Sequence, residues 1–390
     1  MEEIDFDNIF KIQMTGMKII QCHPDTKHDI YWLLKTSIIF GLYTLEFYFV
    51  GNSMLVDIRN KDLLNAFQSA VPVSFYIFVM INYSFLINNS KSIGQMFKIM
   101  KSDYEKMPNL DQRCRSVIID TTTKCSWILK YWSRLTTSCV VVFCLKSICL
   151  SIYYILKDQY EFVPLHEMHY PEFIEKHKKN NIYVFAFTYV AEFYFISLTI
   201  LVYVCSTPLG PLFMLHACSQ LELVKIKFED IFKKDDVEKR LSDIVEDLQL
   251  AYGFIAEINK SFTIIYEIMM KEFSVRCPVT CYAFVKAFSH REFAVEHVIV
   301  IVATMIFTAM PCYYSDLLMS KGEEVRQAAY DCGWERVFNP GARKTLLIIV
   351  NRASNPTAVK SIFCTINLDT LTNVFRQAYT IFNLMCAMWD

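Results

Sequence analysis

The sequence contains little glycine, little proline and almost no net charge. Its 390 residues include 9 glycines and 11 prolines, which leaves no room for a low-complexity linker. The 39 basic and 40 acidic residues nearly cancel to a net charge of −1, so the overall charge does not point to nucleic acid as a partner. The acidic start, MEEIDFDNIF, lacks the basic region and cleavage site of a signal peptide, which predicts a retained N-terminus.

Motifs of enzymes and metal centres are also missing. No phosphate-binding loop, GxSxG or GxGxxG occurs, and no two of the 14 cysteines form a CxxC pair. The cysteines lie mostly in apolar runs, which favours reduced core thiols. In the segment HEMH, His166 and His169 lack the spacing that places two zinc ligands on one helical face, and capping and surface charge explain the group at residues 290–297. We therefore predict no metal, no cofactor and no catalytic residue.

Long apolar runs dominate what is present. Hydrophobic residues make up 54% of the chain, and the mean hydropathy is +0.26. A run of about 20 apolar residues is long enough to cross a bilayer as a helix. We therefore predict an all-α integral membrane protein with seven transmembrane helices. The predicted spans are residues 33–55, 67–87, 135–156, 183–205, 262–288, 298–318 and 368–389.

The basic residues give these spans a direction. Lysine and arginine are concentrated before the first span and between spans two and three, four and five, and six and seven. The positive-inside rule places these segments, and the N-terminus, in the cytoplasm and the C-terminus outside. Residues 92–107 and 213–259 are charged and amphipathic, which predicts inner helices that pack into a cytoplasmic anchor domain. The fifth span should begin in water and enter the membrane near Phe273.

The seventh span is too polar to face lipid on all sides. On a helix, Asn373, Gln377, Thr380 and Leu384 follow one stripe. A polar stripe on a spanning helix indicates either a wall that faces water or polar groups that bond to neighbouring helices of a bundle. The residues alone leave both interpretations open.

Ionisable and aromatic side chains within the spans are the other candidates for function. Glu46, Lys146, Glu192 and Arg376 lie in apolar runs, where burial of a charge is expensive. Lys146 and Glu192 either form an ion pair between consecutive spans or separately reach water. Aromatic residues crowd the outer halves of spans two to four. They fit a pocket for an apolar molecule, with hydroxyls such as those of Ser147 or Ser151, and equally an interfacial belt or ordinary packing.

The final third of the chain resembles the C-terminal signature of insect odorant receptors. The resemblance is carried by Ala329-Tyr330, Trp334, a short apolar helix that starts with a lysine, Asn355-Pro356, Lys360 and NLDTLTNVFRQAYTIFNLM. The related gustatory receptors close with Thr-Tyr, five apolar residues and Gln-Phe, whereas Thr380 here is followed by IFNLMCAMWD. The long insertion of the shared co-receptor is missing from the second inner loop. The chain therefore resembles a ligand-tuning subunit.

This resemblance implies a non-selective cation channel that a small volatile apolar molecule opens. The expected assembly is a hetero-tetramer with the odorant receptor co-receptor, in the plasma membrane and, by family, in sensory neuron dendrites, in contact with lipid and without nucleic acid. Each subunit would give its last helix to the pore. Matching Leu368-Asp369 and Thr380-x-Phe382 implies a hydrophobic gate at Leu384 beside the polar Asn383, with Gln377 and Thr380 on the same pore stripe.

The resemblance also implies a ligand pocket in the outer halves of spans two, three, four and six. The sixth span cannot be placed in register. The chain would then divide into a cytoplasmic arm (1–31), six spans with the pocket and inner-loop helices (32–318), an anchor segment (319–366) and the pore helix (367–390). The candidate ligand-binding residues are Pro72, Phe75, Tyr76, Ser147, Leu150, Tyr154, Tyr189 and Phe193.

Two alternative functions follow from related architectures. The first is a gustatory-type channel, which the missing closing motif disfavours. The second is a metabotropic seven-helix receptor, which would have an outer N-terminus, an acidic-Arg-aromatic triplet after the third span and an NPxxY motif in the seventh. Here Asn355-Pro356 precedes the seventh span and is followed by Thr-Ala. A membrane enzyme or transporter would need a clustered catalytic set or an internal repeat, and the sequence shows neither.

Overall fold

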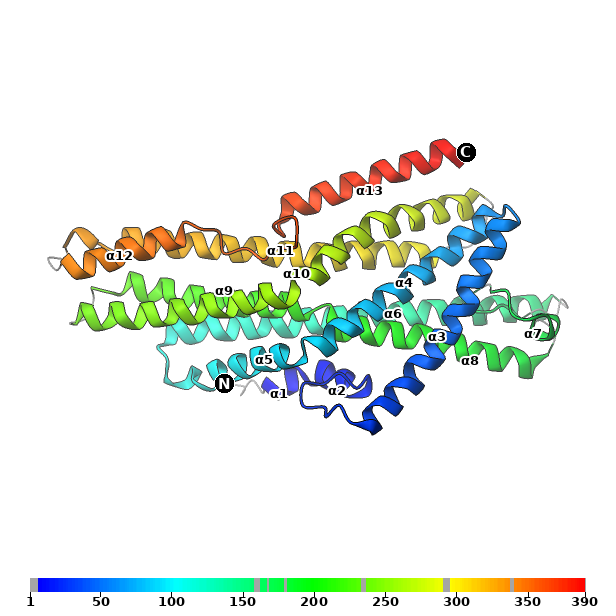
Figure 1. Ribbon diagram of the computed structural model, residues 1–390, viewed down its shortest axis with the longest axis horizontal. Coiled ribbons are helices and arrows are strands. Elements are labelled where there is room, and N and C mark those ends of the chain that lie inside the picture. Colours follow the sequence, from blue (N-terminus) through cyan, green and yellow to red (C-terminus); the bar gives the residue numbers. More distant parts are fainter. Residues whose placement is uncertain are drawn as a thin grey trace.

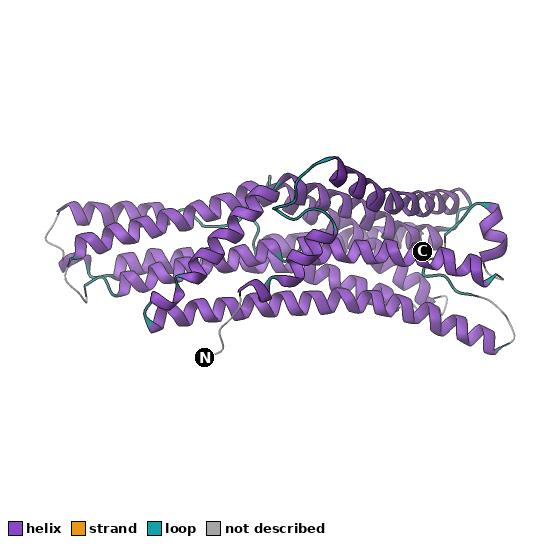
Figure 2. Ribbon diagram, turned by 90° about the horizontal axis from the view of Figure 1, so that it is seen from below, coloured by secondary structure: helices purple, strands orange, loops and turns teal. Residues whose placement is uncertain are grey.

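The computed structural model describes residues 6–157, 162–166, 168–178, 181–232, 236–289, 295–336 and 340–389. Throughout this part of the chain the fold is helical, with one isolated antiparallel bridge between Lys360 and Thr365 and no strand. Figures 1 and 2 show long helices that run roughly along the long axis of an elongated bundle. The helices are α1 (Phe6–Ile9), α2 (Lys11–Ile19), α3 (Ile30–Arg59), α4 (Leu63–Asn88), α5 (Ser90–Glu105), α6 (Gln112–Leu156), α7 (Glu172–Lys178), α8 (Ile182–Ser206), α9 (Leu209–Glu229), α10 (Val237–Ser289), α11 (Val295–Asp331), α12 (Pro340–Ala353) and α13 (Leu368–Trp389), with short 3-10 turns at Met107–Asn109 and Trp334–Arg336.

Each predicted span lies within one helix of the structure. Within the described residues, five segments are long and apolar enough to cross a membrane: Ile30–Arg59, Asn65–Asn88, Gln112–Leu156, Ile182–Glu229 and Val295–Asp331. Apolar side chains such as Ile38, Ile148 and Phe187 are exposed on α3, α6 and α8, as expected of faces that contact lipid. The fifth and seventh predicted spans are not among the five segments, because charged residues of α10 and the amides of α13 lower their hydropathy.

Several helices continue far beyond their apolar runs. α10 is 53 residues long and α6 is 45, so neither breaks where the sequence changes from amphipathic to apolar. Their polar parts gather with α5, α9, α12 and the end of α11 at one end of the bundle, and α7 lies at the other (Figure 1). α9 begins directly after Pro208 and is buried on every side from Leu209 to Ser219, since α6, α10 and α11 pack around it. The amphipathic pattern predicted for residues 213–259 is therefore wrong for the beginning of this segment.

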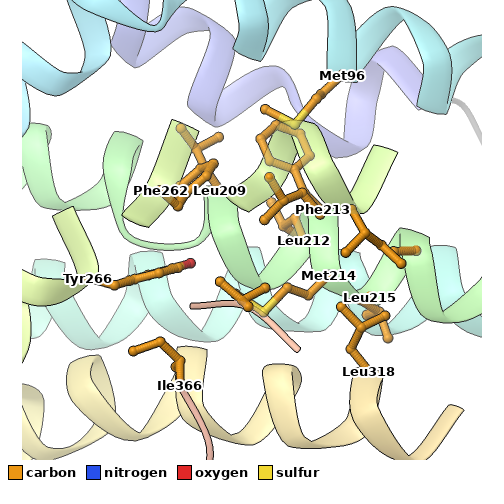
Figure 3. Close-up of a cluster of buried hydrophobic side chains, with 14 of the residues drawn as sticks. Met96, Leu209, Leu212, Phe213, Met214, Leu215, Phe262, Tyr266, Leu318 and Ile366 are labelled. Atoms are coloured by element: carbon orange, nitrogen blue, oxygen red, sulfur yellow. The ribbon is translucent and has the colours of Figure 1, made fainter. Parts of the chain in front are cut away.

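The core around α9 collects side chains from five elements. Figure 3 shows Met96 from α5, Phe213 from α9, Tyr266 from α10, Leu318 from α11 and Ile366 from the segment before α13. Gly210 of α9 allows Tyr266 of α10 to pack closely, because a Cβ atom added at residue 210 would lie 1.7 Å from the Tyr266 hydroxyl oxygen. Such overlap cannot be relieved without moving a buried ring. The close contact between α9 and α10 therefore depends on a glycine.

We expect Gly210→Ala to destabilise the protein by about 1–3 kcal/mol, the usual cost of overpacking a core. Gly253→Ala is the matched control, because Gly253 also lies within a helix and an added Cβ there meets nothing within 4 Å. The control should be neutral or stabilising by up to about 1 kcal/mol, as alanine favours helix. Thermal unfolding of the detergent-solubilised protein measures both variants. Equal melting temperatures for the two would contradict the assignment.

The segment before α13 is fixed to the bundle through side chains of α10 and α11. Asn259 accepts a hydrogen bond from the Lys360 amide at 2.8 Å. Ser315 accepts one from the Val359 amide at 3.0 Å, and Thr357 donates to the carbonyl of Leu318 at 3.0 Å. α13 then packs on α10 and α11 and lies at the edge of the bundle (Figure 1). The position of the last helix is thus set by these two neighbours.

Candidate functional site

A small apolar cavity lies between α4, α6, α8, α10 and α11. Its volume is about 100 Å³, and aliphatic and aromatic side chains form most of its wall. The rings of Phe75 and Phe307 both meet that of Tyr203 edge-on, with centroids 5.8 Å and 5.4 Å apart. Trp132 donates to the backbone carbonyl of Tyr203 at 3.1 Å, which fixes the indole. We call this space the inner cavity.

One charged side chain, Arg276 of α10, borders the inner cavity and is only 2% exposed. Its Nη1 atom donates to the Tyr203 hydroxyl at 3.0 Å and lies 2.8 Å from a carboxylate oxygen of Glu272, one turn earlier. The guanidinium stacks over the Phe75 ring, 4.3 Å from its centroid. The Nε atom is buried and has no hydrogen-bond partner. Arg276 is therefore a charged residue at the border of a cavity whose surface is apolar, and Glu272 balances its charge.

A larger and more polar cavity of about 540 Å³, the outer cavity, adjoins the inner one. Its lining includes polar residues of α4, such as Gln68, and residues 162–166 and Met168 of the loop after α6. The two cavities have five lining residues in common, which places them side by side. These shared residues are Val71, Pro72, Phe143, His166 and Val300.

The ion pairs differ from those considered from the sequence. Lys146 pairs with Glu296 of α11 at the border of the outer cavity. Glu192 is fully buried and lies 3.9 Å from Lys178 of α7, so a pair between Lys146 and Glu192 is wrong. Residues 290–294 of the group at 290–297 lie outside the described residues. Surface charge does not explain Glu296, whose side chain is 12% exposed.

Two serine hydroxyls and one carboxylate hold the loop at residues 162–166 against the helices. Ser147 donates to the carbonyl of Val163, whose amide donates to Ser151. Glu192 accepts from the backbone amides of Leu165 and His166. The two serine hydroxyls considered as ligand contacts are therefore bonded to this loop. The loop in turn forms one wall of the outer cavity.

The two histidines of the HEMH segment have separate surroundings. His169 contacts the carboxylate of Asp57 on α3 at 2.9 Å. His166 borders both cavities, and desolvation, helped by the positive charges of Lys146 and Lys178, lowers its pKa to about 4. The imidazole of His166 is consequently neutral at pH 7. It offers a neutral polar group to a molecule at the junction of the cavities.

The predicted ligand-binding residues are divided between the cavities and other surroundings. Ser147, Leu150 and Tyr154 line the outer cavity, Phe75 the inner one, and Pro72 both. The remaining three have other neighbours. Tyr76 stacks on Phe47 of α3, Tyr189 packs on Phe185, and Phe193 is 42% exposed on α8.

Sequence reasoning missed the contribution of α10 and could not place that of α11 in register. Arg276 lies just beyond Phe273 in an apolar run, and an arginine at such a position is itself a signal. On α11, Val300, Thr304 and Phe307 face the inner cavity at helical spacing. These three residues show which face of the sixth predicted span borders the cavity, which could not be placed from the sequence.

The polar stripe of α13 faces away from the rest of the chain. Leu371, Val374, Ala378 and Met385 are buried against the bundle, whereas Asn373, Gln377, Thr380, Asn383 and Leu384 are all exposed. Thr380 donates to the carbonyl of Arg376 in its own helix. The interpretation in which the stripe bonds to neighbouring helices of the same chain is therefore wrong. The stripe remains available to water or to another subunit.

Comparison with known proteins agrees with this architecture. A model of the family described as 7tm odorant receptor matches residues 62–379. Odorant receptor 2a of Drosophila melanogaster is 23% identical over 167 residues, a stretch that covers 39% of each chain. The olfactory receptor OR5 of Machilis hrabei in complex with eugenol superimposes with a TM-score of 0.80 at 14% identity, over 98% of this chain and 97% of that one. The structure of OR5 described without eugenol gives 0.76, over 97% and 96%.

Several long apolar helices with exposed apolar faces define the class as a multi-pass membrane protein. More particularly, the chain belongs to the 7tm odorant receptor family, whose model covers most of its length.

Proposed function

We propose that this chain is an odorant-tuning subunit of a non-selective cation channel, which a small volatile molecule opens. The observation that carries the proposal is that α10 borders the inner cavity and also packs against α13, the helix with an exposed polar stripe. One helix thus touches both the candidate ligand site and the candidate pore wall. The structure of OR5 of Machilis hrabei, a protein of similar fold, is in complex with eugenol. This supports a small molecule as the ligand.

In the proposed channel, α13 lines a pore that several subunits share. Leu384 forms an apolar constriction beside Asn383, with Gln377 and Thr380 further along the same stripe. An apolar ring stops ions by excluding water and conducts when it widens. A single copy of α13 cannot enclose a pore, so the proposal requires other subunits, which we take to be copies of the co-receptor in a hetero-tetramer.

The ligand would act by differential affinity for two states of the bundle. Pro72, Phe75, Ser147, Leu150 and Tyr154 are its proposed contacts from α4 and α6. A molecule in the inner cavity would displace α10 and with it α13. The proposal includes seven spans with a cytoplasmic N-terminus, and a plasma membrane location.

The decisive experiment expresses the chain with a co-receptor and records currents across a panel of volatile compounds. We expect at least one volatile to evoke a cation current that the co-receptor alone does not give. The control is the same panel on cells that express the co-receptor alone. Silence towards every volatile, with the chain verified at the cell surface, would overturn the proposal.

A further inference from the structure

We propose that the two cavities together bind one uncharged amphipathic molecule, with its apolar tail in the inner cavity and its hydrogen-bonding end in the outer cavity. This inference rests on the proposed function and specifies the class of the ligand and its orientation. Primary alcohols with an unbranched chain are the simplest members of this class. Three observations support it: the contrast between the two cavity surfaces, the side chains of the outer cavity, and the volumes.

The surfaces of the two cavities differ in polarity. The inner cavity exposes only apolar surface, whereas the outer cavity exposes polar and apolar surface alike. The threonines that border the inner cavity donate their hydroxyls within their own helices: Thr136 to Trp132, Thr199 to Phe195 and Thr304 to Val300. A ligand hydroxyl in the inner cavity would therefore lose its hydrogen bonds to water without replacement. An alkyl tail has no such bonds to lose.

Gln68 of α4 provides a hydrogen-bonding group in the wall of the outer cavity. Its side chain is half-buried, and within the described part of the chain its amide has no hydrogen-bond partner. A glutamine amide has both donors and an acceptor. A hydroxyl group, which donates and accepts, therefore matches Gln68.

The charges of the outer cavity favour an uncharged ligand. Among the described residues that line it, the lysine and the glutamate, Lys146 and Glu296, pair with each other. His166, at the junction of the cavities, is neutral at pH 7. A charged ligand would compete with the ion pair and lose its own hydration. A neutral hydroxyl avoids this cost.

The two volumes fit this orientation. An apolar cavity of about 150 Å³ takes up benzene, so the inner cavity, at about 100 Å³, has room for a tail of about four carbon atoms. The outer cavity, at about 540 Å³, holds the rest of the molecule. Pro72 and Val300 border both cavities, so a ligand that lies along them reaches from one to the other. Alcohols of about eight carbon atoms are therefore suitable probes.

The test compares 1-octanol, octane and 1,8-octanediol on the chain expressed with its co-receptor. The measured quantity is the free concentration that gives half-maximal current. We expect this concentration to be about tenfold or more lower for 1-octanol than for 1,8-octanediol. The reason is that the second hydroxyl of the diol must either enter the apolar inner cavity or keep the alkyl chain out of it.

Two variants distinguish the ends of the ligand. Gln68→Leu removes the hydrogen-bonding amide and should reduce the potency of 1-octanol relative to octane by about threefold to tenfold. Ala303 borders the inner cavity only, so Ala303→Leu reduces the space for the tail. Along the series from 1-butanol to 1-decanol, this variant should shorten the most potent chain by about three carbon atoms, the number that leucine adds.

Gln327→Leu is the matched control, because Gln327 lies on α11 outside the linings of both cavities and donates to Asp331. It should leave the potency ratio and the best chain length unchanged. Equal potency of 1-octanol and 1,8-octanediol in the unmodified receptor would overturn the inference, as would a ratio that Gln68→Leu does not change. Responses to other volatiles with silence towards every primary alcohol would also overturn it. These results leave the proposed function standing, whereas silence towards every volatile, with the chain at the surface, overturns both proposals.

Discussion

Replacing Leu384 by alanine should raise the current that flows without ligand. Leu384 is 57% exposed on the face of α13 that no helix of its own chain covers. If this face closes a shared pore, the leucine side chains bury apolar surface against one another in the closed state. Truncation then removes on the order of 1–2 kcal/mol of closed-state stabilisation per subunit, so a rise in basal current of about tenfold is expected. Whole-cell current in the absence of odorant, normalised to surface expression, measures it.

An exposed leucine in the segment between α11 and α13 provides the matched control. Leu347 lies on α12 and is 69% exposed, so Leu347→Ala removes a similar amount of apolar surface away from α13. Its basal current should equal that of the unmodified receptor. If Leu384→Ala also leaves basal current and ion selectivity unchanged, Leu384 is not the gate.

The helical architecture could be predicted from the sequence because apolar runs of spanning length are a local signal. The same signal could not give the helix ends. α10 runs without a break from Val237 to Ser289, because α9 and α11 pack against it and stabilise the helix beyond the apolar run. The burial of α9 could not be predicted either. The second half of α9 carries charged residues, which made the whole helix look amphipathic, whereas other helices enclose its first half.

Within the candidate site, residue types were easier to predict than partners. Lys146 was recognised as an unusual charge in a span, but its partner Glu296 is 150 positions away on α11. The bond from the Ser147 hydroxyl to the carbonyl of Val163 could not be predicted either, because the loop that contains Val163 has no regular sequence pattern. Pairings of this kind depend on how distant helices pack, which hydrophobic periodicity in a single sequence does not encode.

Coupling between the cavity and the last helix should depend on the contact between Phe273 and Phe375. Phe273 of α10 is fully buried, and its ring meets that of Phe375 on α13 edge-on at 5.1 Å. Arg276, which borders the inner cavity, follows one helical turn later on α10. A ligand that shifts this turn therefore moves a side chain that touches α13 directly. Weakening the contact should reduce the response to ligand more than it reduces folding.

We expect Phe273→Leu and Phe375→Leu each to raise the odorant concentration for half-maximal current by several-fold, with about the same increase in the double variant. An aromatic pair contributes about 0.5–1.5 kcal/mol beyond area burial, which sets a coupling of up to about tenfold. The control cycle uses Phe85 of α4 and Phe262 of α10, whose rings lie 5.0 Å apart in a contact that does not involve α13. Leucine at those two positions should lower thermal stability and leave odorant sensitivity unchanged. Strictly additive effects of Phe273→Leu and Phe375→Leu would mean that the signal reaches α13 by another contact, such as the one between α11 and α13.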